Sequence, residues 1–278
     1  DKKFGNITFY SNIRKKIRKK IENISPDIIH THMFGYYTLA SLDTGHKKVI
    51  VSTHGMPSSN WDKPPSFTEI IRYCSQDYIY TTCARKAKRI VINSPYTKEH
   101  LAKFKKTNFY ELNNPVSGPF FDIDNNAEDK DRIFFAGYIC DAKGVMTILE
   151  AFNILKKTHS FLTLRLAGNI VDYNFYMKAV RYIKDNKLEG SVNFLGQLNE
   201  NDLMDEYRKA SVFVFPSKQD VAPVAVLQAM ASGKAVVASN IGGISYILDD
   251  GINGFLVNKM DSDALANKVS LFLKDIKL

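Results

Sequence analysis

The chain has 278 residues, so it holds either one large domain or two domains of about 130 residues each. Hydrophobic residues make up 45% and charged residues 24% of the sequence, a globular composition that excludes a disordered chain, a collagen and a coiled coil. The net charge of +9 lies mostly in the first 130 residues, where 21 Lys and Arg face 13 Asp and Glu, and it favours an anionic partner such as nucleic acid, acidic lipid or a phosphorylated substrate.

The first half of the chain alternates short apolar runs with segments of helical periodicity. We predict strands at residues 27–32, 48–54 and 89–94, and helices near residues 11–24, 35–42, 66–88 and 96–105. This alternation is typical of βα units built around a parallel sheet.

The first predicted helix is strongly basic. Between residues 12 and 24, four isoleucines share one helical face and six Lys and Arg surround them. Such a helix either lies on an anionic membrane or packs its isoleucines into a domain while its cations are solvated. Both interpretations stay open, and the first would give the chain a peripheral membrane contact.

A break in periodicity separates two halves of the chain. Residues 115–132 are rich in Pro, Gly, Asp and Asn, as in a linker. We therefore expect two domains, at residues 1–120 and 121–278. In the second domain, strands are predicted at residues 132–138, 162–168, 191–196, 211–216 and 234–239, each followed by a helical stretch.

The helix predicted at residues 144–157 carries the first candidate site. Five apolar side chains from Val145 to Leu155 share one face, so this helix should pack on the sheet. In an open α/β sheet, ligands bind beyond the carboxyl ends of the strands. Lys143 and Gly144 stand there at the helix start, where a lysine beside free N–H groups suits a phosphate. A surface lysine followed by a turn glycine is the alternative.

A second candidate segment follows the strand at 211–216. Pro223 suits the first turn of a helix and Ser232-Gly233 suits its end. The helix is apolar on most sides, so Gln228 should be buried and would need partners such as ligand hydroxyls. Asp220 precedes the helix near the same mouth, where it either meets a ligand or caps the loop.

Gly242 and Gly243 form the third signal. They follow the strand at 234–239 and precede a helical stretch, so their backbone N–H groups should be exposed to a ligand.

Residues 134–274 resemble the group 1 family of retaining, nucleotide-sugar-dependent glycosyltransferases with the GT-B fold. PDIIHTH, VSTHG and NNPV in the first half resemble the acceptor-side domain of that family more weakly. The matching stretches of the second half follow the order and spacing of the family: FFAGYICDAKGVMTILEAF, RLAGN, VNFLGQL, LMDEYRKASVFVFPS, DVAPVAVLQAMASGKAVVASNIGG and LDDGINGFLV.

The resemblance implies an α/β chain of GT-B type, with two Rossmann-like parallel-sheet domains facing a cleft. The second domain would hold the nucleotide-sugar donor, and the first would hold a glycan, lipid-linked or small-molecule acceptor. The donor-binding positions implied are Gly137, Lys143, Gly144, Gly168, Leu195, Gln228, Gly242 and Gly243.

The resemblance also implies residues at the reacting centre. Asp220 and Gln228 match an acidic pair whose first member faces the donor sugar and whose second faces the ribose. His32 and His54 match strand-end histidines near the anomeric carbon, so the catalytic candidates are His54, His32 and Asp220. As ordinary strand-end histidines they would need no ligand.

The chain departs from the family pattern at three places. Tyr138 stands where an arginine is usual, Gln228 replaces the second acid, and Ala222-Pro223 replaces Phe-Gly, which removes a backbone donor. The first strand and glycine-rich loop of the family have no counterpart before residue 1, and its closing helix has none after residue 278. We therefore expect a truncated first domain.

We expect neither a metal nor a cofactor besides the donor. The leaving diphosphate would be stabilised by Lys143 and backbone N–H groups. Two D-x-D strings, at residues 122–124 and 261–263, resemble metal-binding strings of other glycosyltransferases, but their places in a linker and at a helix start favour capping.

The sequence has no apolar run of about 18 residues and no signal peptide. Its three cysteines, Cys74, Cys83 and Cys140, lack the spacing of a zinc site, so we expect reduced thiols and a cytoplasmic chain, at most peripheral to the membrane.

Three alternatives to a glycosyltransferase function remain: a binding-only or inactive GT-B homologue, a basic protein that binds membrane or nucleic acid, and a sugar-nucleotide epimerase. No recognisable nucleic-acid-binding module supports binding to nucleic acid.

Overall fold

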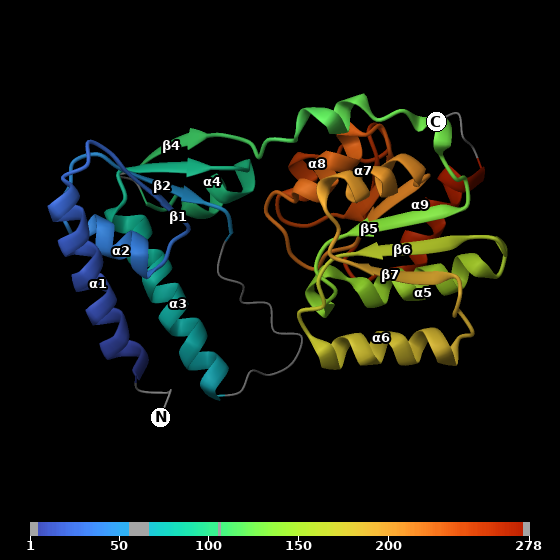
Figure 1. Ribbon diagram of the computed structural model, residues 1–278, viewed down its shortest axis with the longest axis horizontal. Coiled ribbons are helices and arrows are strands. Elements are labelled where there is room, and N and C mark those ends of the chain that lie inside the picture. The colour runs from blue at the N-terminus through green and yellow to red at the C-terminus, as the bar shows by residue number, and fades with distance from the viewer. Residues whose placement is uncertain (1–4, 56–66, 105–106, 275–278) are drawn as a thin grey trace. The chain divides into compact units, whose positions relative to one another are not determined.

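The computed structural model describes residues 5–55, 67–104 and 107–274 (Figure 1). The chain forms two compact units, Asp1–Asn113 and Asn114–Leu278, hereafter the first and second units. Each contains one all-parallel sheet with helices packed on it, so the expected class of two α/β parallel-sheet domains is confirmed. The two units are described separately below.

The boundary lies after Asn113 rather than after residue 120, because residues 114–131 pack on the second unit. Phe120 is 1% exposed within the core of that unit, and its ring stands edge-on to Tyr207 with centroids 5.7 Å apart. The Pro, Gly and Asp content breaks this segment into short 3-10 helices, but a buried aromatic ring anchors it.

The first unit has a four-stranded parallel sheet in the order β1-β2-β3-β4. Its elements are α1 (Gly5–Ile24), β1 (Ile29–His32), α2 (Tyr36–Leu42), β2 (Val49–Thr53), α3 (Phe67–Lys86), β3 (Arg89–Ile92), α4 (Pro95–Leu101) and β4 (Asn108–Glu111). The sequence analysis did not predict β4, since this strand has only two aromatic residues between polar ends and lies, mostly exposed, at the edge of the sheet.

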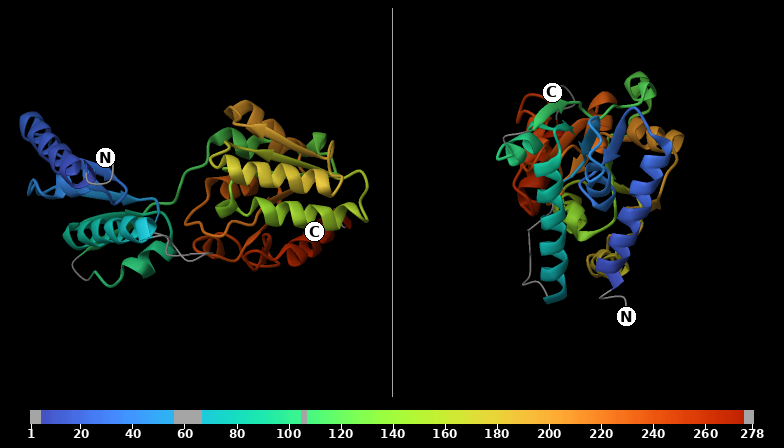
Figure 2. Two further views of the ribbon diagram at one scale, coloured as in Figure 1. Left: turned by 90° about the horizontal axis from the view of Figure 1, so that it is seen from below. Right: turned by 90° about the vertical axis from the view of Figure 1, so that its left-hand side faces the viewer.

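Helix α1 packs along α2 and uses its isoleucines inside the first unit (Figures 1 and 2). Ile21 contacts the core formed by β1, β2 and β3, whereas Ile24 at the end of the helix is 61% exposed. The four lysines at positions 15, 16, 19 and 20 are exposed. The structure therefore uses the apolar face for packing and leaves the basic face to solvent.

The second unit has a six-stranded parallel sheet in the order β10-β9-β8-β5-β6-β7. Its strands are β5 (Arg132–Ala136), β6 (Thr163–Ala167), β7 (Val192–Gly196), β8 (Val212–Phe215), β9 (Ala235–Ser239) and β10 (Phe255–Val257). Its helices are η1 (Gly118–Asp122), η2 (Asn125–Ala127), η3 (Asp141–Lys143), α5 (Val145–Lys156), α6 (Tyr173–Asp185), α7 (Glu200–Lys209), α8 (Val224–Ala231), η4 (Ile244–Tyr246) and α9 (Ser262–Lys274).

Helices cover both faces of this sheet. Helices α5, α6 and α9 lie on one face, and α7 and α8 lie on the other (Figures 1 and 2). The predicted helix at 144–157 is confirmed as α5, and the five apolar side chains of its predicted face are each 4% exposed or less. Because both faces are covered, β8 is buried along its whole length, as parallel strands usually are.

Gly144 joins η3 to α5 in a conformation that favours glycine. Its φ is +71°, and a Cβ atom at this position would lie 1.9 Å from the carbonyl oxygen of Pro216, which follows β8. The loop after β5 and the loop after β8 can therefore approach each other only if residue 144 has no side chain.

Replacing Gly144 with alanine should lower the free energy of unfolding by at least about 3 kcal/mol, since left-handed strain and a steric clash add together. Gly190 is the matched control, because its φ is +78° but a Cβ atom there would meet nothing within 4 Å. Gly190→Ala should cost only about 1 kcal/mol of backbone strain. Urea unfolding of both variants measures the difference, and equal losses would show that the contact with Pro216 is unimportant.

Candidate functional site

The candidate site lies at the switch point of the second sheet. From β5 the chain moves through β6 to β7 on one side, and it then returns to β8 on the other side of β5. The loops that follow β5 and β8 therefore leave the sheet in opposite directions and open a crevice beyond its carboxyl edge.

A cavity of about 440 Å³ occupies this crevice. It is lined by the ends of β5, β6, β7 and β8 and by the start of α8. The lining residues are Ala136, Gly137, Tyr138, Lys143, Gly168, Asn169, Gln197, Phe215, Asp220, Ala222, Pro223, Val224 and Ala225. Four of the predicted site residues, Gly137, Lys143, Gly168 and Asp220, are thus brought together.

Lys143 and Asp220 form an ion pair inside this cavity. The Nζ atom of Lys143 lies 2.5 Å from Oδ2 of Asp220 and 5.5 Å from the ring centroid of Phe215. The two side chains are 24% and 16% exposed. An ammonium group has three N–H donors, so Lys143 keeps donors for a ligand oxygen besides the carboxylate.

Gly137 and Gly168 let the ends of β5 and β6 pass close to one another. Gly168 has a φ of +139°, and a Cβ atom there would lie 1.9 Å from the carbonyl oxygen of Gly137. The N–H of Gly137 donates to the carbonyl of Ala167 at 2.9 Å. These glycines therefore shape the floor of the cavity, and the N–H of Gly137 is engaged within the sheet edge.

Leu195 and Gln228 do not line the cavity. Leu195 is half-buried in β7 and packs against the core, because the alternation of a strand turns it away from the neighbouring residues. Gln228 was expected to be buried, but it is only half-buried on α8, and no hydrogen bond of its side chain occurs among the described residues. Val224 on the same helix is 38% exposed, so α8 is less enclosed than its apolar sequence indicates.

The glycine pair after β9 also differs from its prediction. Gly242 has a φ of +50° and Gly243 precedes η4, a single turn of 3-10 helix. The N–H of Gly243 donates to the carbonyl oxygen of Asp220 at 3.1 Å. This donor is therefore engaged in holding the loop that carries Asp220.

Sequence reasoning missed two polar residues of the cavity. Asn169 and Gln197 stand just after β6 and β7, and Nδ2 of Asn169 donates to Oε1 of Gln197 at 2.8 Å. Polar side chains directly after parallel strands were the available signal. The exposed Tyr138 also lines the cavity, so a tyrosine stands in this lining where the resemblance led us to expect a second cation.

The predicted histidines form a cluster in the first unit. Nδ1 of His32 lies 3.0 Å from Nε2 of His54, and the two rings are stacked with centroids 5.3 Å apart. His30, which the sequence analysis missed, has its ring centroid 4.4 Å from that of His32, and its Nε2 atom lies 2.7 Å from Oγ of Ser52. Alternation along β1 puts His30 and His32 on one face, and this was the available signal.

The cluster disfavours a charge on His54. Loss of solvent around the ring lowers the pKa of His54 below the ordinary value, and the nearby His32 and His30 lower this pKa further. The neutral form of His54 has one donor nitrogen and one acceptor nitrogen. Its tautomer therefore decides whether Nε2 of His54 donates the hydrogen bond to His32 or accepts it.

The D-x-D strings contribute caps. Oδ1 of Asp261 accepts the N–H of Ala264 at the start of α9, and Oδ1 of Asp124 accepts the N–H of Asn126 in η2. Within the described ranges, no group of three or more His, Cys, Asp and Glu side chains is placed to hold a metal ion.

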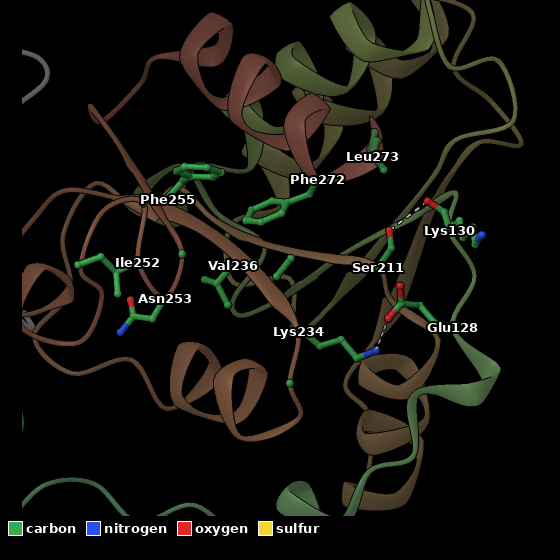
Figure 3. Close-up of a pocket in the computed structure, with 14 residues that line it drawn as sticks. Glu128, Lys130, Ser211, Lys234, Val236, Ile252, Asn253, Phe255, Phe272 and Leu273 are labelled. Carbon is green, nitrogen blue, oxygen red and sulfur yellow. Dashed lines mark hydrogen bonds and ion pairs between the residues drawn. The ribbon is translucent and has the colours of Figure 1, made fainter. Parts of the chain in front are cut away.

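A second cavity of about 430 Å³ lies at the opposite, amino edge of the same sheet (Figure 3). The Lys234 side chain is fully buried there and pairs with Oε2 of Glu128 at 3.1 Å, while Oγ of Ser211 donates to the carbonyl of Lys130. Burial lowers the pKa of Lys234, and Glu128 opposes this shift. These polar groups bond to one another within the chain. We therefore interpret this cavity as a structural junction, at which the segment that precedes β5 meets β9.

None of the helices in residues 5–55, 67–104 and 107–274 is both long enough and apolar enough to span a bilayer.

Comparison with known protein families gives two adjoining matches. The family model described as Glycosyl transferases group 1 matches residues 119–278, and the model of Glycosyltransferase Family 4 matches residues 3–116. The two matches meet between residues 116 and 119, close to the boundary between the two units.

Individual proteins give the same picture. An uncharacterized glycosyltransferase of Methanocaldococcus jannaschii is 25% identical over 96% of this chain and 71% of its own length. The lipopolysaccharide 1,2-N-acetylglucosaminetransferase of Salmonella typhimurium is 32% identical in the matched part. This part covers 54% of the present chain and 41% of that protein. The solved structure of Anabaena HepE in complex with UDP and glucose superposes with a TM-score of 0.74 at 16% identity, covering 99% of this chain and 74% of that one. The expected GT-B fold class is thereby confirmed.

Replacing His32 with alanine should raise the pKa of His54, because one of the neighbouring charges that disfavour its protonation is removed. In wild type, His54 binds more protons in the unfolded chain than in the folded chain just below about pH 6.5, so His54 makes stability rise with pH in that window. Titration of the imidazole C–H signals by NMR measures the pKa directly. His159→Ala, in the second unit, is the control, and an unchanged pKa of His54 in His32→Ala would refute the coupling.

Proposed function

This chain belongs to the group 1 glycosyl transferases, and from this membership we propose that it transfers a hexose from a nucleotide-sugar donor to a glycan, lipid-linked or small-molecule acceptor. We further propose that the anomeric configuration is retained and that no metal takes part. The observation that carries the proposal is the ammonium group of Lys143, which lies inside the switch-point cavity just before the start of α5.

The second unit would bind the donor. A diphosphate group needs positive charge and N–H donors at one place, and the cavity offers the Lys143 ammonium beside the amino end of a 12-residue helix. Asn169 and Gln197, which also line the cavity, provide amide groups of the kind that hydrogen-bond a ribose or a sugar. The printed title of the HepE structure, which names UDP and glucose, supports this class of donor.

Lys143 would also take part in the transfer step. When the bond between the sugar and the diphosphate breaks, negative charge develops on the leaving oxygen, and a fixed ammonium stabilises it. Metal ions fulfil this task in other enzymes. The metal-free proposal therefore assigns this charge stabilisation to Lys143 and to the first-turn N–H groups of α5.

The first unit would bind the acceptor. Its clustered His30, His32 and His54 stand at the carboxyl end of β1 and directly after β2, the edge at which α/β units place ligands. We assign His32 and His54 to polar contacts with the reacting groups. The lowered pKa of His54 favours a neutral imidazole, whose unprotonated nitrogen can accept a proton from a hydroxyl group and whose N–H can donate a hydrogen bond.

An acceptor on an anionic membrane fits the exposed basic face of α1. The isoleucines of α1 at positions 13, 17 and 21 are at least half-buried, so contact would be electrostatic and would not require insertion of the helix.

A binding-only homologue would bind the nucleotide sugar without releasing the nucleotide, and assays of turnover distinguish that case.

Lys143→Ala should weaken donor binding by about 2 kcal/mol, the scale of a lost charge-assisted hydrogen bond. Calorimetric titration with UDP, GDP, ADP and their sugar conjugates, with magnesium or with chelator, identifies the nucleotide and measures the loss. Lys130→Ala removes the same charge at the opposite edge of the sheet and should leave affinity unchanged. If wild type binds a nucleotide and Lys143→Ala binds it equally well, the assignment of Lys143 is wrong.

Alanine at Lys15, Lys16, Lys19 and Lys20 should weaken binding to vesicles that contain anionic lipid, by about 1 kcal/mol for each lysine near the surface. The control replaces four exposed cations on or beside α6 of the second unit, Lys178, Arg181, Lys184 and Lys187, so that net charge changes equally. Co-sedimentation with vesicles measures both variants. Equal weakening in the two would show that only overall charge matters.

A further inference from the structure

The side chain that opens the second unit holds one wall of the candidate cavity. Nδ2 of Asn114 donates to the carbonyl oxygen of Ala222 at 2.8 Å, across 108 positions of sequence. Asn114 is the first residue of the second unit, directly after the boundary at Asn113. Among the described residues, Ala222 lines the cavity and Asn114 does not. The hydrogen bond therefore reaches the cavity wall from outside the cavity.

Neighbouring loops hold the start and the middle of the loop that leads from β8 to α8. The N–H of Lys218 donates to the carbonyl of Ala142 at 2.9 Å, and the carbonyl of Asp220 accepts the N–H of Gly243 at 3.1 Å. Neither bond reaches the last two residues before α8. That end of the loop is where Asn114 acts.

The peptide group between Ala222 and Pro223 has one atom that can form a hydrogen bond. Pro223 has no backbone N–H, so this atom is the carbonyl oxygen of Ala222. Ala222 is half-buried and Pro223 is buried, so leaving this oxygen without a donor would cost free energy. A carbonyl oxygen is also partly negative, and it would repel a diphosphate if it turned into the cavity. The amide of Asn114 satisfies this oxygen from outside.

Packing fixes the segment that carries Asn114. Val116 packs against the core of the second unit, and Phe120 is 1% exposed within that core. Helix η1 of the same segment also lies against α8. Since the support of Asn114 is anchored by these contacts, its bond to Ala222 can determine where the cavity wall lies.

We propose that Asn114 is a positioning residue for the nucleotide cavity. By holding the Ala222 carbonyl, it fixes the end of the loop that carries Asp220 and the start of α8. The proposal rests on the donor role of this cavity given above. Coupling of this kind is reciprocal: if the bond strengthens nucleotide binding, a bound nucleotide strengthens the bond. Binding in the cavity therefore also stabilises residues 114–122, which follow the boundary between the two units.

The test uses three variants. Asn114→Asp keeps the size of the side chain but replaces the N–H donors with oxygen, and Asn114→Ala removes the amide without adding charge. Asn113→Asp is the matched control, because it adds the same charge at the exposed preceding residue. Calorimetry gives the Kd of UDP, GDP and ADP, and of their glucose conjugates, at about pH 7.5 and about pH 5. Thermal unfolding at each pH checks that every variant is folded.

Near neutral pH, Asn114→Asp and Asn114→Ala should bind the nucleotide roughly tenfold more weakly than wild type, since a partly buried hydrogen bond is lost. The introduced carboxyl group faces a carbonyl oxygen, so its pKa should lie above the ordinary value of about 3.9. As the pH falls, this group takes up a proton, becomes a donor to Ala222 and restores affinity relative to wild type at the same pH. Asn114→Ala should not recover, and Asn113→Asp should show no loss.

Hydrogen exchange gives a second measurement that does not depend on an added charge. A bound nucleotide should slow exchange of the backbone N–H groups between residues 116 and 122 in wild type, and it should slow them less in Asn114→Ala. This measurement decides the matter if Asn114→Asp does not fold.

Three results would overturn the inference while leaving the proposed function intact. Both Asn114 variants bind the nucleotide as tightly as wild type, or Asn113→Asp loses as much affinity as Asn114→Asp, or the loss in Asn114→Asp persists unchanged at low pH. If wild type binds no nucleotide or conjugate under any condition, the donor role of the cavity fails first and the inference falls with it.

Discussion

The approach of the Gly144 backbone to the Pro216 carbonyl is the constraint on which the second unit depends. It brings together two loops that leave the sheet in opposite directions, and it requires a residue without a side chain in the left-handed region. Once the loops meet, Lys143 and Asp220 have little freedom to lie anywhere but beside each other. The same two loops line the cavity, and the first of them leads directly into α5.

Apolar periodicity in the sequence predicted most of the fold because the strands of both sheets are short, buried and bounded by turn residues. It failed where burial is weak. Both missed strands lie at sheet edges: β4 has polar residues at its two ends, and β10 is apolar but has only three residues, so neither gives an apolar run of useful length. The cap at Asp261 was predictable because a carboxylate directly before a helical run has few other uses.

The site was predictable where chemistry and strand ends coincide, as at Lys143 and Asp220. It was not predictable on α8. Apolar residues occupy nearly every side of this helix, so their pattern does not show which side faces the core, and Gln228 could lie on any face. The hydrogen bond between Gly243 and the Asp220 carbonyl joins loops that are distant in sequence, and no local pattern indicates it. His30 was overlooked although it shares a strand face with His32.

The packing of Phe120 against Tyr207 bears on how this chain can be dissected. The segment that joins the two units belongs physically to one of them, so excision at residue 114 would give a fragment with its aromatic core complete. Excision at residue 121 would leave a ring-sized void in that core, at a cost of about 3–5 kcal/mol. Fusion proteins and chimaeras that exchange the first unit should accordingly be joined before Asn114, where composition alone would have placed the junction too late.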